Sequence, residues 1–229
     1  RYFSTKYSQY ATSDLCLLFD IAMNNKTLFP SINMPIKEDW QQYIDRWVAA
    51  YVRASSNPPS KRRASPKSSC SDPVIKEIVR VATQLSDTSA TEAETYHTLF
   101  MSAENCQGGL LEEYIAAEIA PLGWIWCQGN TLRSVDFCTS DGGYLLQVKN
   151  KSNTENSSSS AIRTGTTIEK WYRLGTRTVN GEKVPDYRWE DLNSIINTQS
   201  GQRTNLSEEG YLKFIRSIVT ANSEIITDR

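Results

Sequence analysis

The sequence predicts an α/β (α+β) fold in which helices flank a mixed central β-sheet. Helical apolar spacing dominates the N-terminal third, short β-rich segments follow Gly108, and helical patterning returns near the C-terminus. The chain has 229 residues, of which 39% are hydrophobic and 22% charged, so it can form a packed core. We expect a mainly helical region over residues 1–105 and a sheet-centred region over residues 106–229, or one continuous domain that includes both.

The N-terminal region is expected to be helical on both sides of one polar loop. Glu38–Arg53 places aromatic and aliphatic residues at helical spacing, which predicts a helix with an apolar stripe. Residues 54–72 are rich in serine and proline and predict a basic loop. Helices are expected next at Pro73–Leu85, where proline suits the first turn, and at Ala90–Met101.

The second region begins with a helix and continues as a meander of short strands. Pro121 and Gly123 end the amphipathic helix Gly109–Ala120. Alternation and turn residues predict the following elements, in order: strands at Trp124–Gln128, Leu132–Thr139 and Tyr144–Lys149, a helix at about Thr166–Leu174, a hairpin turning at Asn180-Gly181, and a last helix from Ser207 to about Thr220.

The charge of the chain is segregated although its sum is close to zero. Lys and Arg number 25 against 26 Asp and Glu, which excludes a uniformly basic protein. Residues 53–70 carry five basic and no acidic side chains, and residues 149–177 carry six basic and two acidic ones. A fold that joins these stretches presents a positive face to phosphate; the alternative is a plain polar loop and solvated surface.

Several function classes are disfavoured by residue usage. No apolar run approaches the roughly 20 residues that span a bilayer, so no membrane partner is expected. The single histidine, His97, disfavours Ser-His-Asp chemistry and multi-histidine metal sites. Five cysteines without a CxxC pair favour reduced thiols and a cytoplasmic location.

The Asp141-Gly142 pair predicts a hairpin that brings polar residues together. If these two residues form the loop, Asp136 lies opposite Gln147. Because residues two apart share a face, Asp136, Gln147 and Lys149 lie on one face. The opposite face is expected to enter the core, with Val135, Phe137, Leu146 and Val148.

Such a cluster suits metal-assisted hydrolysis of a phosphodiester. Mg²⁺ prefers oxygen ligands, which the Asp136 carboxylate, the Gln147 amide and the Val148 backbone carbonyl could supply. Lys149 would orient the attacking water and balance developing charge. The alternative is a surface hairpin carrying an ordinary Asp–Lys pair.

The same residues resemble the active site of PD-(D/E)XK nucleases. Val135-Asp136, ten residues, then Gln147-Val148-Lys149 is similar to that motif, with Gln at the second acidic position. The family's helical glutamate resembles Glu112, which shares a helical face with apolar residues, and Glu113 is the second choice. The resemblance implies a nuclease-like sheet, Mg²⁺ as cofactor and double-stranded DNA as substrate.

The polar segment after Lys149 resembles the recognition loops of type II restriction endonucleases, in particular the SinI/AvaII-like group. That resemblance implies a short palindromic site of the GG(A/T)CC type. Symmetric DNA is most simply cut by a homodimer, with one subunit per strand. Arg and Asn read base edges, while Ser, Thr and Lys reach phosphates. The candidate DNA-contacting residues are Lys61, Arg62, Arg63, Asn150, Lys151, Asn153, Asn156, Ser158, Arg163, Thr166, Lys170, Arg173, Arg177 and Arg203.

Two other functions remain open from the sequence. One is a non-specific or repair nuclease of the same fold. The other is a DNA-binding module in which the Asp136, Gln147 and Lys149 cluster is inert.

Overall fold

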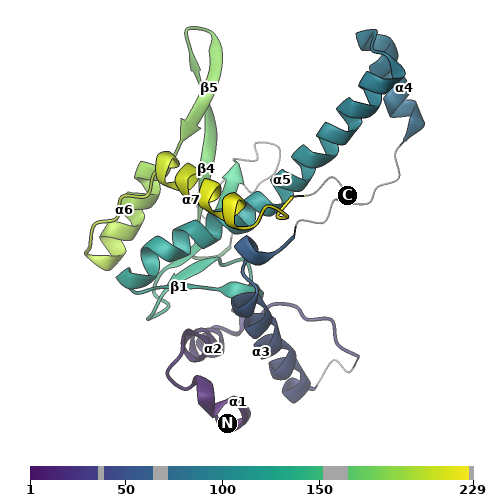
Figure 1. Cartoon of the computed structure of the whole chain (residues 1–229). Helices are drawn as coiled ribbons and strands as arrows, with labels where there is room; N and C mark the ends of the chain where they lie inside the picture. The colour runs from purple at the N-terminus through teal and green to yellow at the C-terminus, as the bar shows by residue number, and fades with distance from the viewer. Residues whose placement is uncertain (36–38, 64–71, 152–164, 227–229) are drawn as a thin grey trace.

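The computed structural model describes residues 1–35, 39–63, 72–151 and 165–226. Figure 1 shows the arrangement of the helices and strands. In chain order the main elements are α1 (Tyr2–Lys6), α2 (Asp14–Asn24), α3 (Trp40–Ser56), α4 (Pro73–Thr83), α5 (Asp87–Ile119), β1 (Trp124–Trp126), β2 (Phe137–Thr139), β3 (Leu145–Lys151), β4 (Ile168–Val179), β5 (Glu182–Tyr187), α6 (Trp189–Ser200) and α7 (Glu208–Ala221).

The five strands form one mixed sheet, as the sequence predicts. Their order is β1-β2-β3-β4-β5, and all neighbours are antiparallel except β3 and β4, which are parallel. The predicted register of the central hairpin is confirmed, because Phe137 pairs with Leu146. The loop itself is longer than predicted: Gly142 donates its N–H to the Thr139 carbonyl at 2.9 Å, and the ladder resumes where Thr139 donates to Tyr144.

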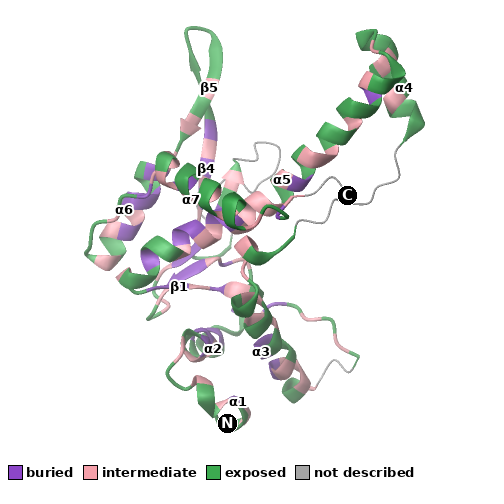
Figure 2. Cartoon of the chain, viewed as in Figure 1, coloured by how far each residue is buried: buried purple, intermediate pink, exposed green. Residues whose placement is uncertain are grey.

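Both faces of the sheet are covered, by different helices. On one face Ile125, Cys138, Leu145 and Ile168 pack with the helices of the N-terminal region. On the other face Phe137, Leu146, Val148 and Trp171 pack with the C-terminal half of α5 and with α6 and α7. Figure 2 shows the buried residues concentrated in these layers. Alternation along each strand therefore places consecutive side chains in two different cores.

The two helices predicted on either side of Gly108 are one helix. α5 runs without interruption from Asp87 to Ile119, and it spans the division expected at 105/106. A Cβ on Gly109 would come within 2.9 Å of the Pro59 side chain. Gly109 therefore serves close packing against the turn at Pro59–Lys61 and does not end the helix.

Two further expectations at the sheet are wrong. The segment predicted as a helix at Thr166–Leu174 is strand β4, which pairs in parallel with β3. Leu132–Asp136 is not a strand, and Ser134 adopts a left-handed conformation with φ 63°. As a result, Val135 packs in the core of the N-terminal region and not beside Phe137.

The hairpin between β4 and β5 turns at Asn180-Gly181, as predicted, with both residues at positive φ. This ribbon and the pair formed by α4 and the N-terminal half of α5 extend away from the sheet (Figure 1). The C-terminal helix is also confirmed, and Ser207 caps it by accepting the Gly210 N–H. Within the described residues, no helix combines the length and the apolarity needed to span a membrane.

Candidate active site

Asp136 is held at the start of the central hairpin by backbone hydrogen bonds. Its N–H donates to the Leu146 carbonyl at 2.9 Å, and its carbonyl accepts from Cys127 at 2.9 Å. Its carboxylate Oδ2 accepts the Val148 N–H at 2.7 Å. The side chain is therefore fixed against β3, one residue from both Gln147 and Lys149.

Glu112 reaches the same place from α5. The Trp126 indole Nε1 donates to Glu112 Oε2 at 3.1 Å, which fixes the carboxylate beside β1. Burial and the nearby Asp136 raise the pKa of Glu112 to about 7, although Trp126 and Lys149 act in the opposite direction. Burial also raises the pKa of Asp136, against the Val148 N–H and Lys149.

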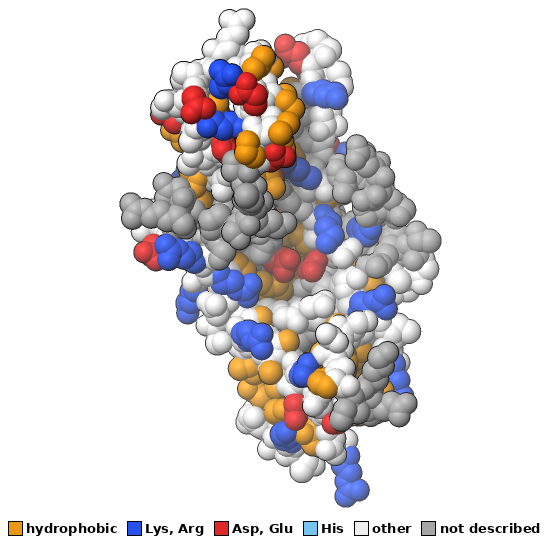
Figure 3. Space-filling model, turned by 90° about the vertical axis from the view of Figure 1, so that its right-hand side faces the viewer, with side chains coloured by type: hydrophobic (Ala, Val, Ile, Leu, Met, Phe, Trp, Pro, Cys, Tyr) orange, Lys and Arg blue, Asp and Glu red, His pale blue; other side chains and the backbone are white. Residues whose placement is uncertain are grey.

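These two carboxylates line a pocket of about 290 Å³. Figure 3 shows acidic side chains at the bottom of a hollow in the middle of one face, with Lys and Arg side chains around it. The pocket is lined, among others, by Pro59, Arg62, Gly109, Trp126, Gln128 and Asn130. The pocket therefore has negative charge at its centre and positive charge at its rim, an arrangement that favours binding of a cation at the centre and of a phosphate group beside it.

The remaining members of the cluster lie along β3. Gln147 is 7% exposed and Val148 is 5% exposed. Lys149 is exposed to solvent, yet its charge stabilises the ionised forms of both Glu112 and Asp136. The structure thus brings together Asp136, Lys149 and Glu112, and Gln147 lies on β3 next to Val148, whose N–H holds the Asp136 carboxylate.

Glu113 has a different environment from Glu112. Its Oε2 accepts the Ser60 N–H at 2.8 Å, and its Oε1 accepts the Ser60 hydroxyl at 2.5 Å. These bonds tie the turn at Pro59–Lys61 to α5. The geometry therefore favours Glu112 over Glu113 as the residue that acts in the pocket.

The residues present fit a divalent cation of the magnesium type. In the described part of the chain, no group of three or more His, Cys, Asp or Glu side chains is placed to hold a metal ion. Mg²⁺ needs only one or two carboxylates when phosphate and water complete its shell. Burial raises the pKa of both Glu112 and Asp136, so holding the two carboxylates ionised is costly unless a cation lies nearby.

The basic turn at Lys61, Arg62 and Arg63 lies next to this pocket. All three residues are exposed, and Arg62 lines the pocket directly. The Arg62 Nε donates to the Asn57 carbonyl at 2.7 Å, which leaves the rest of the guanidinium available for an anion. Arg63 lies 4.0 Å from Glu224 in an exposed pair.

The other candidate DNA contacts are distributed unevenly. Asn150 binds Gln107 and Arg173 through its amide, and Lys151 pairs with Glu104 at 3.6 Å. Arg177 is exposed on β4, and Arg203 is exposed between α6 and α7. Thr166 precedes β4, and Lys170 lies near the start of that strand. Asn153, Asn156, Ser158 and Arg163 lie outside the described residues.

Arg173 is buried, which argues against a contact with DNA. It is 5% exposed, and its guanidinium donates to Glu208 at 2.5 Å and to Asn150 at 3.0 Å. Tyr187 and Tyr211 stack on the same group, at 5.5 and 5.4 Å. This network joins β4, β5 and α7.

Arg173→Ala should accordingly lower the free energy of unfolding by roughly 2–4 kcal/mol, because it leaves the Glu208 carboxylate without its ion-pair partner in a partly buried position. Urea denaturation measures the change. Arg177→Ala, at an exposed position on the same strand, should stay within about 0.5 kcal/mol of wild type. Equal effects of the two substitutions would contradict the structural role of Arg173.

Sequence reasoning missed the two residues that hold the glutamates of α5. Trp126 holds Glu112, and Ser60 holds Glu113. Alternation along β1 places Trp126 on the same face as Trp124, toward α5, and that signal could have found it. Ser60 lies 53 residues from Glu113, and no local pattern connects the two.

Comparison with known proteins shows similarity to restriction enzymes. The model of the family described as SinI restriction endonuclease matches residues 47–221, more than half of the chain. The type II restriction enzyme Eco47I of Escherichia coli is 36% identical over 162 residues, which cover 68% of this chain and 65% of that enzyme. The type II restriction enzyme SinI of Salmonella infantis is 32% identical over 192 residues, covering 70% of this chain and 83% of that enzyme. The chain belongs to the SinI restriction endonuclease family.

Proposed function

We propose that the protein is a Mg²⁺-dependent type II restriction endonuclease that hydrolyses both strands of double-stranded DNA at a short palindrome. The observation that carries the proposal is the pairing of Glu112 and Asp136 in one basic-rimmed pocket, next to Lys149. The match to the SinI family supports a palindrome of the GG(A/T)CC type, the site that the sequence resemblance implies.

The residues of the pocket have separable roles in this mechanism. Asp136, the Gln147 amide and the Val148 carbonyl would hold the metal ion, and a bound Mg²⁺ supplies charge stabilisation at the scissile phosphate. Lys149 orients the attacking water and neutralises charge that develops on the phosphate. Glu112, whose pKa is about 7, can hold or release a proton at its carboxylate near neutral pH.

A plasmid digest tests the function directly. Incubation with Mg²⁺ should give discrete fragments whose ends map to one palindrome, while a parallel reaction in EDTA should leave the plasmid intact. A smear would indicate a non-specific nuclease of the same fold. Intact DNA in both reactions would indicate an inert DNA-binding module.

We expect one set of basic residues to contact DNA phosphates and another to contact base edges. Alanine at Lys61, Arg62 and Arg63 should weaken binding to cognate and scrambled duplexes alike and flatten the salt dependence by about one unit per lost contact. Arg163→Ala should reduce the difference in binding free energy between cognate and scrambled duplexes by about 1–3 kcal/mol. Titrations at several salt concentrations without Mg²⁺ measure both. A full cognate preference in the Arg163 variant would place base reading elsewhere.

A palindromic site calls for two copies of the pocket related by twofold symmetry. We therefore propose a homodimer as the active form, with one subunit acting on each strand.

A further inference from the structure

The turn at Pro59–Lys61 and the Arg62 that follows it are held by two distant parts of the chain. Glu113 of α5 accepts the Ser60 N–H at 2.8 Å and the Ser60 hydroxyl at 2.5 Å. Asn222, at the end of α7, donates its side-chain amide to the Ser60 carbonyl at 3.0 Å and to the Arg62 carbonyl at 3.4 Å. The backbone from Ser60 to Arg62 is therefore tied to both α5 and α7, although it lies at the surface.

The Arg62 side chain lies in the pocket with its end groups free. Arg62 lines the pocket together with Glu112 and Asp136. Its Nε donates to the Asn57 carbonyl at 2.7 Å, which fixes the inner part of the guanidinium. Within the described residues, no hydrogen bond uses its two terminal nitrogens and no ion pair joins it to either carboxylate. Both terminal nitrogens can therefore donate to an anion that enters the pocket.

The other two basic residues of this segment are placed differently. Lys61 and Arg63 are exposed like Arg62, but neither is among the residues that line the pocket. Arg63 lies 4.0 Å from Glu224. The charge of Arg62, by contrast, acts on the Glu112 carboxylate, against the burial that is the main cause of the raised pKa of Glu112. The three charges are therefore not equivalent.

We propose that Arg62 is a further catalytic residue, which contacts the scissile phosphate and stabilises the negative charge of the transition state. Glu113 and Asn222 are its positioning residues, because they hold the turn that carries it. The inference rests on the proposed function, since it assigns a role within the hydrolysis of DNA. A guanidinium can donate to two phosphate oxygens at once, and donors that are already in place need no rearrangement as charge develops.

The reaction shows why such a contact accelerates cleavage. The oxygen of the attacking water forms a bond to phosphorus, and the bond from phosphorus to the sugar oxygen breaks with its electron pair on that oxygen. One proton of the water is lost to solvent and the sugar oxygen gains one from solvent, so water is the only reagent consumed. The phosphate and sugar oxygens carry more negative charge in the transition state than in the bound diester. A guanidinium that contacts them therefore binds the transition state more tightly than the substrate.

Single-turnover cleavage of cognate DNA at saturating DNA and Mg²⁺ tests the role of Arg62. Arg62→Ala should lower this rate by roughly 100-fold or more, while the salt dependence of DNA binding without metal should flatten by about one unit, as for any phosphate contact. Arg62→Lys keeps the charge without the fork of donors, so it should recover affinity more than rate. Guanidinium ion, added at concentrations that leave the circular dichroism spectrum unchanged, should restore part of the rate of Arg62→Ala.

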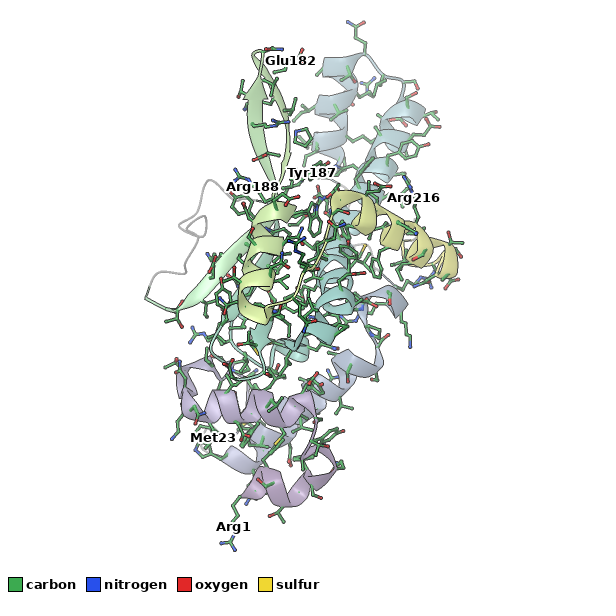
Figure 4. The ribbon with its side chains drawn as sticks, turned by 90° about the vertical axis from the view of Figure 1, so that its left-hand side faces the viewer. Arg1, Met23, Glu182, Tyr187, Arg188 and Arg216 are labelled. Atoms are coloured by element: carbon green, nitrogen blue, oxygen red, sulfur yellow. The ribbon has the colours of Figure 1, made fainter. Side chains whose placement is uncertain are left out.

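Two substitutions serve as comparisons. Lys61→Ala removes the same charge from the same turn but outside the pocket, so its loss should appear in affinity, with a loss of rate at least about 10-fold smaller than that of Arg62→Ala. Arg216 is an exposed arginine on α7 (Figure 4), and Arg216→Ala should retain the wild-type rate and affinity. Equal losses of rate for Lys61→Ala and Arg62→Ala would show that Arg62 is an ordinary phosphate contact and would overturn the proposal.

A double-mutant cycle tests the positioning role of Glu113. Glu113→Gln weakens the hold on Ser60 and should lower the single-turnover rate by about 10-fold in a protein whose circular dichroism spectrum shows it to be folded. In the Arg62→Ala background the same change should cost less than about 2-fold, because its effect passes through Arg62. Asn222→Ala should behave in the same way. Losses that multiply in full would show that Glu113 and Asn222 act independently of Arg62, and would overturn their positioning role.

The cleavage assay also separates this inference from the proposed function. A wild type that cuts no DNA with Mg²⁺ would refute the function, and the catalytic role of Arg62 with it. A wild type that cuts at one palindrome, together with a folded Arg62→Ala variant that cuts equally fast, would overturn the role of Arg62 alone and leave the function standing.

Discussion

Asp136→Ala should reduce the rate of DNA cleavage by roughly 1000-fold or more at saturating Mg²⁺. The substitution removes the carboxylate that the Val148 N–H orients toward β3, and with it the main candidate ligand for the metal ion. Binding of cognate DNA without metal should be unchanged or tighter, because one negative charge near the phosphates is lost. Single-turnover cleavage and a binding titration separate the two effects.

Lys149→Ala should lose cleavage by a similar factor, because among the described residues the charge of Lys149 acts on both Glu112 and Asp136, whereas that of Arg62 acts on Glu112 alone. Asp141→Ala provides the control on the same hairpin. Asp141 accepts bonds from Thr139 and the Gly143 N–H within the turn, outside the pocket. Cleavage by the Asp136 or Lys149 variant at the rate of the Asp141 variant would refute the active-site assignment.

The parts of the fold that local chemistry determines were predictable. Asp141-Gly142 and Asn180-Gly181 predict turns because their backbone conformations suit only a few residues, and the register of the first hairpin follows from its turn. Ser207 predicts the start of α7 because a serine hydroxyl satisfies a free N–H there. Each signal lies within a few residues of the structure that it specifies.

Elements that depend on distant partners were not predictable. The sequence of β4 mixes β-formers with residues at helical spacing, and only pairing with β3 selects the strand. The two glycines at 108–109 resemble a helix end, but contact with Pro59, fifty residues earlier, explains Gly109. In both cases tertiary packing overrides the local preference.

The candidate site shows the same division. The hairpin register placed Asp136 opposite Gln147, and helical facing favoured Glu112, from short-range patterns alone. The hydrogen bond from Trp126 to Glu112 and the burial of Arg173 depend on contacts between separate elements. Sequence spacing therefore identifies candidate catalytic side chains more readily than it identifies the residues that position those side chains.

The acidic pair in the pocket should make the metal-free protein less stable as pH rises. The pKa of Glu112 is about 7 in the folded chain and about 4.5 as the ordinary value, so between these pH values the folded state binds more protons than the unfolded state. The contribution of Glu112 to the free energy of unfolding is therefore fully present below pH 4.5 and is lost as the pH rises through 7. Glu112→Gln removes the titration and should stabilise the protein at pH 8 by at most about 3 kcal/mol, with little gain at pH 4.5.

Urea unfolding in EDTA at both pH values measures this gain, and Glu113→Gln is the matched control. Glu113 accepts two hydrogen bonds from Ser60, so its substitution should lower stability at pH 8 by about 1 kcal/mol, the opposite sign. Adding Mg²⁺ should reduce the stability difference between Glu112→Gln and wild type, because a cation held in the pocket would offset the negative charge of Glu112 and stabilise wild type by mass action. A Glu112 variant that is less stable than wild type at pH 8 in EDTA would show that this carboxylate is a structural group, and the pocket would lose one of its two acids as a candidate for the chemistry.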